Sequence, residues 1–247
     1  MNRLYADLAH LWPDLSPPDD YAAEAAELGR LLAERVGPGP LKLCEFGAGG
    51  GSTLAHLSEL GSRGGVHGVT AVDRSPEMLA VAAGHAPGLR CVVADMRSVT
   101  LPDAGSFDAV LAHDAIDYLR TEADLVATAR AAAALLRPGG VFLAAPTYTA
   151  ETFEPGEAAE DAALLAGGGR PAAEVAFGTA VRRTPGGARM TISLTVRGQD
   201  GSVEEVEDVH ELGLFDRATW LRALRDAGLH AEAVASDGPW SMFVGRA

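Results

Sequence analysis

The sequence is poor in features that mark several classes of protein. Only two of its 247 residues are cysteines, Cys44 and Cys91, and each lies within an apolar run, so we expect reduced core thiols. No run of 18 or more apolar residues occurs, which argues against a membrane-spanning helix. The first seven residues lack the apolar centre of a secretory signal. We therefore expect a soluble, cytoplasmic protein.

Positive charge is also scarce. Lysine and arginine number 20 against 34 acidic residues, which gives a formal net charge of −14 at pH 7. A surface of this sign repels phosphate backbones and anionic lipid headgroups. Arg182, Arg183 and Arg189 are too few to form a nucleic-acid site. We expect a small-molecule substrate, neither nucleic acid nor membrane as a partner, and leave a homodimer open.

The most informative segment is a glycine-rich turn between a strand and a helix. The apolar run 41–46 leads into Gly47, Gly49 and Gly51, and a helical pattern begins directly afterwards. Glycine permits backbone angles that a Cβ disfavours and lets a ligand approach the main chain closely. The helix start also offers free N–H groups. This combination predicts a nucleotide-type ligand at the turn.

The spacing within this turn distinguishes two kinds of nucleotide. The dinucleotide fingerprint G-x-G-x-x-G requires a third glycine where this chain has Ser52, so a nicotinamide-dependent oxidoreductase is the weaker alternative. The series Glu45-x-Gly47-x-Gly49-x-Gly51 instead resembles motif I of the class I S-adenosylmethionine (SAM) dependent methyltransferases. The resemblance implies SAM as cofactor and S-adenosylhomocysteine as product. A SAM-binding protein that has lost catalysis is a further alternative.

Further motifs of the same family follow in order along residues 41–147. By resemblance, Asp73 binds the ribose hydroxyls, Asp95 and Met96 meet the adenine, and His113 with Asp114 contacts the methionine part of the cofactor. Glu45 supports the loop and the cofactor's amino group. The full set of predicted cofactor-binding residues is Glu45, Gly47, Ala48, Gly49, Gly51, Asp73, Arg74, Met78, Asp95, Met96, His113 and Asp114.

The resemblance also implies the fold. We expect an α/β protein with a Rossmann-like, doubly wound sheet of strand order 3-2-1-4-5-7-6 whose last strand is antiparallel. That order separates Cys44 from Cys91 by one strand, too far for a disulfide. We predict one domain over 1–247, divided into an N-terminal helical cap (1–36), a SAM-binding core (37–147), a substrate-lid insert (170–214) and a final helix with two strands (215–247).

The insert follows the fifth strand, where the pattern changes from alternating strands and helices to strands in series. Three extended runs cover 174–184, 188–197 and 203–214, separated by glycine-containing turns. They predict a three-stranded antiparallel sheet. The Ala- and Gly-rich stretch 157–169 is predicted to be a mobile surface loop.

The insert and the N-terminus resemble those of bacterial amino-sugar N-methyltransferases. The similarity rests on the run from Glu207 to Asp216 and on the Tyr5-Ala-Asp7 element; those enzymes carry a histidine where this chain has Tyr118. Nucleic-acid amino methyltransferases have an Asn/Asp-Pro-Pro-aromatic loop where this chain has His113-Asp-Ala-Ile116. The resemblance implies methyl transfer to nitrogen or oxygen of a small polar metabolite.

Alignment and desolvation dominate an in-line methyl transfer, so a catalytic base is optional. His210 is the first candidate for a base or substrate anchor, because it lies on the predicted lid strand in an otherwise acidic run; Tyr118 is the second. A solvated strand histidine is the alternative for His210. No metal is expected. Four aromatic residues are predicted to wall the substrate pocket: Tyr5, Trp12, Tyr21 and Tyr148.

Overall fold

The computed structural model describes residues 2–37, 40–62, 66–165, 173–198, 200–235 and 241–247. In this part of the chain the strands form a seven-stranded and a four-stranded sheet. The larger sheet contains β1 (Leu41–Phe46), β2 (Val66–Asp73), β3 (Arg90–Val93), β4 (Phe107–His113), β5 (Leu136–Ala145), β10 (His230–Val234) and β11 (Met242–Arg246).

The strand order of the larger sheet is β10-β11-β5-β4-β1-β2-β3. Strands β1 to β5 pair in parallel, and β11 is antiparallel to both β5 and β10. The predicted order and the antiparallel last strand are confirmed. In such a sheet the carboxyl ends of the parallel strands meet at one edge, where ligands bind.

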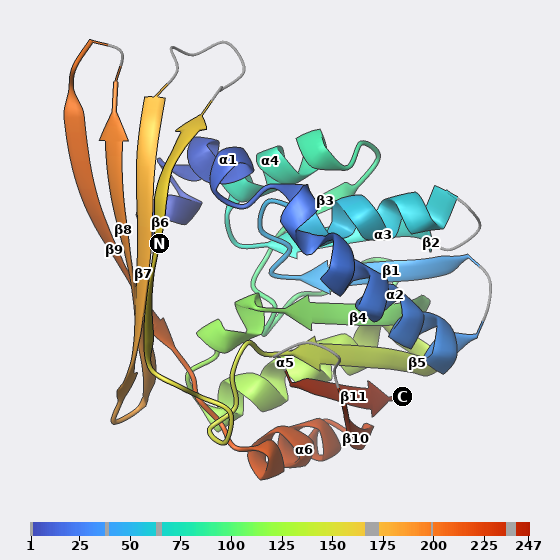
Figure 1. Cartoon of the computed structure of the whole chain (residues 1–247). Coiled ribbons are helices and arrows are strands. Elements are labelled where there is room, and N and C mark those ends of the chain that lie inside the picture. The colour runs from blue at the N-terminus through green and yellow to red at the C-terminus, as the bar shows by residue number, and fades with distance from the viewer. Residues whose placement is uncertain (1, 38–39, 63–65, 166–172, 199, 236–240) are drawn as a thin grey trace.

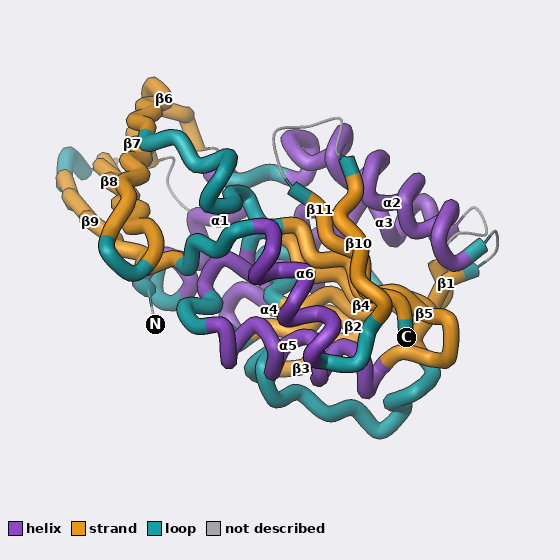
Figure 2. The backbone as a smooth tube through the Cα atoms, turned by 90° about the horizontal axis from the view of Figure 1, so that it is seen from below, coloured by secondary structure: helices purple, strands orange, loops and turns teal. Residues whose placement is uncertain are grey.

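Helices cover both faces of this sheet: α2 (Ala22–Val36), α3 (Ser52–Ser62) and α4 (Pro76–His85) on one, and α5 (Glu122–Leu135) and α6 (Arg217–Asp226) on the other. Successive strand residues alternate between the faces: Leu43 packs with the first group and Cys44 with the second. Figure 2 shows α2 and α3 on the side of the sheet opposite α5 and α6.

Side-chain caps start three of these helices. Ser75 accepts from the Met78 N–H at 2.9 Å, Thr121 from the Asp124 N–H at 3.1 Å, and Asp216 from the Thr219 N–H at 2.7 Å. Each cap satisfies a backbone donor that the first helical turn leaves free.

The second sheet is the insert. It consists of β6 (Gly156–Leu165), β7 (Ala173–Thr184), β8 (Gly187–Arg197) and β9 (Val203–Leu212), all antiparallel and in that order. The three predicted strands are β7, β8 and β9. The predicted mobile loop is wrong over 157–165, because this Ala-rich backbone pairs with β7 despite its weak strand propensity; residues 166–169 lie outside the described residues.

The insert sheet stands across the end toward which β1, β4 and β5 point, and the N-terminal segment lies between the two sheets (Figure 1). That segment consists of η1 (Arg3–Tyr5), η2 (Ala9–Leu11), α1 (Trp12–Leu15) and η3 (Pro18–Tyr21) before α2. Its Leu4, Leu8 and Leu11 pack with Ile192 and Val206 of the insert. The ligand-binding edge of the core is therefore covered by two elements distant in sequence.

One prediction for the core is wrong. Both cysteines are free, and Cys44 is buried on β1, but Cys91 is exposed. Cys91 lies on β3, the edge strand of the sheet, so its apolar run has a neighbouring strand on one side only. An apolar run in the sequence does not distinguish an edge strand from a central one.

We predict that Phe142→Ala lowers the free energy of unfolding by about 3 to 5 kcal/mol, because it leaves a cavity in the core. Phe142 is 1% exposed on β5, with its ring centroid 6.5 Å from that of Phe46. Urea titration measures the effect. Val203→Ala is the control, since Val203 is 51% exposed and its truncation should change little. A loss below about 1 kcal/mol for Phe142→Ala would contradict the assigned core.

Candidate functional site

A cavity of about 740 Å³ lies at the carboxyl ends of β1, β2 and β4 and extends to the insert. This size suits a cofactor together with a small substrate. Its wall combines the glycine turn, the N-terminal segment, the loop after β4 and apolar residues of the insert. From the insert it takes Phe177, Thr179, Val181, Met190, Ile192 and Leu212.

The three glycines of the turn have different physical roles. All have positive φ: +68° at Gly47, +52° at Gly49 and +73° at Gly51. A Cβ on Gly47 would lie 2.2 Å from Ala115 Cβ, and one on Gly51 would lie 2.8 Å from Ala82 Cβ, so both positions are closed by packing. A Cβ on Gly49 would find no atom closer than 3.6 Å. The free space at Gly49 allows a ligand to contact the backbone there.

Asp73 ends β2 on the cavity wall. One carboxylate oxygen accepts from the Gly49 N–H at 2.9 Å and the other from the Ser75 N–H at 2.8 Å. Ser75, and not Asp73, caps α4. Asp73 therefore holds the glycine turn and the start of α4 together, and it presents a carboxylate to the cavity between them.

The cavity wall contains a buried carboxyl group, one oxygen of which lacks a hydrogen-bond partner. Glu45 is 3% exposed, and its Oε2 makes no hydrogen bond with any described residue. Burial raises the pKa of Glu45 to about 8, against the opposing effect of His113. An unpaired buried oxygen is destabilising, so the site favours a cation at this position.

His113 sits among acids. Its Nε2 lies 2.5 Å from Glu24 Oε1 and 3.1 Å from Asp114 Oδ1. Burial opposes its charged form, but Asp114, Glu24 and Glu45 outweigh burial and raise the pKa of His113 to about 9. A protonated His113 thereby links α2 to the end of β4. Glu24 was not predicted, since nothing in its helix indicates a partner on a distant strand.

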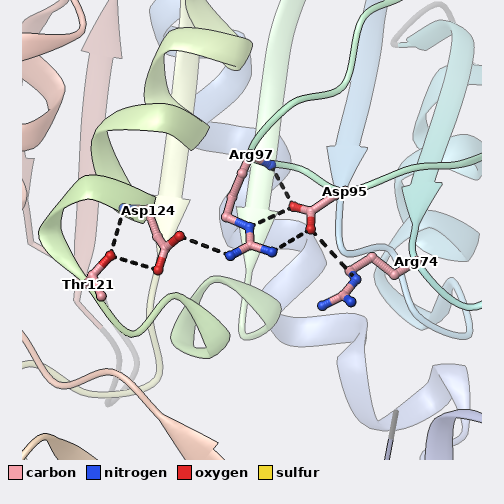
Figure 3. A network of polar contacts seen from close by, with 5 residues as sticks. All are labelled: Arg74, Asp95, Arg97, Thr121 and Asp124. Atoms are coloured by element: carbon pink, nitrogen blue, oxygen red, sulfur yellow. Dashed lines mark hydrogen bonds and ion pairs between the residues drawn. The ribbon is translucent and has the colours of Figure 1, made fainter.

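Asp95 is the predicted cofactor residue that does not line the cavity, although its neighbours Ala94 and Met96 do. Its carboxylate accepts from Arg97 Nε at 3.0 Å and Nη2 at 2.7 Å, and lies 3.7 Å from Arg74 Nε (Figure 3). Arg97 in turn bonds to Asp124 at 3.0 Å. The carboxylate of Asp95 is thus engaged by arginines, and a role toward adenine stays a prediction.

The other predicted cofactor residues and all four predicted aromatic residues line the cavity, as does Tyr118. His210 does not. It is 1% exposed and lies behind Tyr118, whose hydroxyl is 2.5 Å from His210 Nδ1. The alternative of a solvated strand histidine is therefore wrong, because β9 turns this side chain inward beneath the N-terminal segment.

Asp117 is a further site residue that sequence reasoning missed. It lines the cavity at 6% exposure, and one oxygen accepts from the Thr147 N–H at 3.1 Å. Burial, followed by the nearby Asp114, raises the pKa of Asp117 to about 8. The available signal was its place just after β4, at the edge where the other motifs end.

Comparison with known proteins agrees with this geometry. A model of the family described as methyltransferase domain matches residues 44–144. The dTDP-3-amino-3,4,6-trideoxy-alpha-D-glucopyranose N,N-dimethyltransferase of Streptomyces venezuelae is 31% identical over 230 residues, which cover 92% of this chain and 91% of that protein.

Solved structures give the same result. DesVI of Streptomyces venezuelae superposes with a TM-score of 0.78 at 30% identity, over 97% of this chain and 95% of that one. SAM-bound CalS10, an amino pentose methyltransferase from Micromonospora echinaspora, does so with a TM-score of 0.73 at 28% identity, over 92% and 91%.

The chain belongs to the class I SAM-dependent methyltransferases. SAM is its cofactor, and it transfers a methyl group to nitrogen or oxygen of a small polar metabolite. The wall fits SAM on two counts: Gly49 leaves room for close approach, and the unpaired oxygen of Glu45 suits a positively charged group. No helix within the described ranges has the length and apolar character needed to cross a membrane.

We predict that the contribution of Glu45 to SAM binding grows as the pH rises from about 6.5 to 9. Glu45 must lose a proton, with a pKa of about 8, before it can attract the cofactor's ammonium group, so its attraction is absent at low pH and grows as the pH increases. Calorimetric titration at several pH values measures this. Glu45→Gln should weaken binding by about 1 to 3 kcal/mol at high pH.

The SAM amine also titrates, but it affects the wild type and Glu45→Gln equally. The difference in SAM affinity between the two proteins at each pH therefore reports Glu45. That difference should be small at pH 6.5 and large at pH 9. If the SAM affinities of the two proteins changed with pH in parallel, Glu45 would not be the residue that binds the ammonium group.

Proposed function

We propose that this enzyme methylates the amino group of a nucleotide-linked amino sugar. The observation that carries the proposal is the extent of the similarity to the Streptomyces venezuelae N,N-dimethyltransferase. It spans 92% of the chain, and so includes at least most of the insert as well as the cofactor-binding core. The insert supplies part of the cavity wall.

Residues of the core would bind and orient SAM. Asp73, which lines the cavity, would accept from the ribose hydroxyls, the space at Gly49 would admit the adenosyl group, and the unpaired oxygen of Glu45 would attract the ammonium. Met96, which lines the cavity, would meet the adenine, and the backbone near Asp114 would meet the methionine part of the cofactor. When bound, SAM supplies a methyl group activated by a positively charged sulfur.

The substrate side of the cavity suits a deoxysugar with an amine. Phe177, Met190 and Ile192 form an apolar wall from the insert, which matches a sugar that lacks some hydroxyl groups. Asp117 contributes a carboxyl to the cavity wall, which can accept a hydrogen bond from an amine.

The phenols of the cavity favour an amine over a hydroxyl as the methyl acceptor. Burial raises the pKa of both Tyr5 and Tyr118 well above the ordinary value for tyrosine, so neither forms a phenolate near neutral pH. A neutral amine carries its own lone pair and needs no strong base, whereas a sugar hydroxyl must lose its proton during attack. Neutral phenols therefore serve nitrogen better than oxygen.

Incubation with SAM and a panel of nucleotide sugars tests the proposal. We expect methylated product, detected by mass spectrometry, from dTDP-linked 3-amino deoxysugars, and none from the matched 3-hydroxy sugars. Methylation of the hydroxy sugar alone would contradict N-methylation. SAM binding without turnover across the panel would favour the catalytically silent alternative.

A cytoplasmic location and a homodimer stay predictions from the sequence. So does the exclusion of nucleic acid, which rests on the net charge of −14.

A further inference from the structure

A series of polar groups leads from the cavity into the protein. Tyr5 Oη lies 2.9 Å from Tyr118 Oη, and Tyr118 Oη lies 2.5 Å from His210 Nδ1. On the far side of the imidazole, Nε2 lies 3.4 Å from Asp208 Oδ2. Only the two tyrosines line the cavity, so the histidine and the aspartate stand behind them.

These four residues come from three separate parts of the chain: η1, the short helix η4 (Ala115–Tyr118) and β9. The Asp208 carboxylate is oriented by the Leu4 N–H, which donates to Oδ2 at 2.8 Å. The His210 side chain is fully buried, and its ring contacts those of Tyr5 and Tyr118 at centroid distances of 5.4 and 5.8 Å. No bulk water reaches the imidazole, so protons can reach it only through its neighbours.

The arrangement determines which nitrogen carries the proton in neutral His210. Nε2 makes no hydrogen bond with a described residue, but it lies 3.4 Å from the Asp208 carboxylate, and the negative charge of that group favours the tautomer with the hydrogen on Nε2. Nδ1 is then an acceptor, and Tyr118 donates to it. The phenol oxygen keeps two acceptor sites. One serves the Tyr5 hydroxyl, and the other can serve a group in the cavity.

We propose that Tyr118 and His210 form a proton relay that removes the proton from the methylated amine, with Asp208 as the group that positions and stabilises the histidine. The amine lone pair forms the new N–C bond, the S–C bond breaks, and its electron pair stays on sulfur. The resulting ammonium gives a proton to Tyr118 Oη while Tyr118 passes its own proton to His210 Nδ1. The imidazolium lies beside Asp208 and returns the proton by the same route once the product has left.

The surroundings of His210 leave its ring neutral and able to accept a proton. Burial, against the opposing effect of Asp208, lowers the pKa of His210, so the ring is a neutral acceptor at physiological pH. The titratable groups that face it are Asp208 on β9, Tyr118 on η4 and Tyr5 on η1, and its neighbour on β8 is Met190, which does not titrate. The Nε2–Asp208 separation allows a stronger contact when the ring becomes charged.

This inference rests on the proposed amine substrate. The competing explanation is structural: the same contacts would fasten η1 to the insert. Structural fastening predicts lower stability and weaker binding in variants, without any change in the ionisation that controls the rate.

The pH dependence of kcat/KM separates the two explanations. In the wild type we expect kcat/KM to increase with pH in two steps. One step is the loss of a proton by His210, and the other is the loss of a proton by the substrate amine. His210→Gln and Tyr118→Phe should each lower kcat by about 100-fold or more, with SAM affinity nearly unchanged. Each should also remove from the pH profile of kcat/KM the step that the ionisation of His210 causes. Asp208→Asn should move the His210 step of the pH profile to lower pH, because the imidazolium loses its charged partner.

His230→Gln is the matched control, since His230 is exposed on the edge strand β10. It should keep the wild-type rate and profile. Unchanged pH profiles in all three relay variants, whatever their rates, would overturn the relay.

Nitrogen NMR of ¹⁵N-labelled histidine tests the relay without substrate or turnover. We expect the His210 signals, assigned by their loss in His210→Gln, to show a protonated Nε2 and an acceptor Nδ1, and the Nδ1 signal to shift in Tyr118→Phe. A hydrogen on Nδ1 at neutral pH would overturn the proposal. If no amino sugar is methylated, the proposed function fails, and the NMR result alone decides the relay.

Discussion

The site depends on one set of hydrogen bonds, in which the Asp73 carboxylate accepts from the N–H groups of Gly49 and Ser75. These bonds join the end of β2, the glycine turn after β1 and the start of α4. Without them the turn would have to satisfy its backbone donors elsewhere, and its open position at Gly49 would not be held against the cavity. Packing of Gly47 against Ala115 and of Gly51 against Ala82 completes the constraint.

The second half of the site depends on burial. The insert sheet and the N-terminal segment share an apolar cluster that includes Leu4, Leu8 and Ile192, and this cluster brings Tyr5 over the cavity. The same packing removes His210 from water and lowers its pKa. Apolar contacts have no directional preference, yet here they bring the polar groups of the proposed relay next to one another.

Much of the core could be predicted from the sequence, because its signals are local. The glycine turn, Asp73 and the alternation of strands with helices each occupy a few consecutive residues, and the predicted strand order is confirmed. Two features could not be predicted. Strand β6 forms because β7 pairs with a stretch of weak strand propensity, and Cys91 is exposed because β3 is an edge strand. Both depend on neighbours that lie elsewhere in the chain.

By itself the sequence determined the kind of cofactor and the order of the core strands through its resemblance to a known family, and that resemblance rests on the glycine spacing and the acids that end the strands, which are local features. Only the tertiary structure decided which polar groups meet. It placed Glu24 beside His113, left Glu45 with an unpaired oxygen, and set Tyr118 between His210 and the cavity. The reason is physical: these contacts join residues far apart in the chain, and only the packing of helices and two sheets brings them within hydrogen-bonding distance.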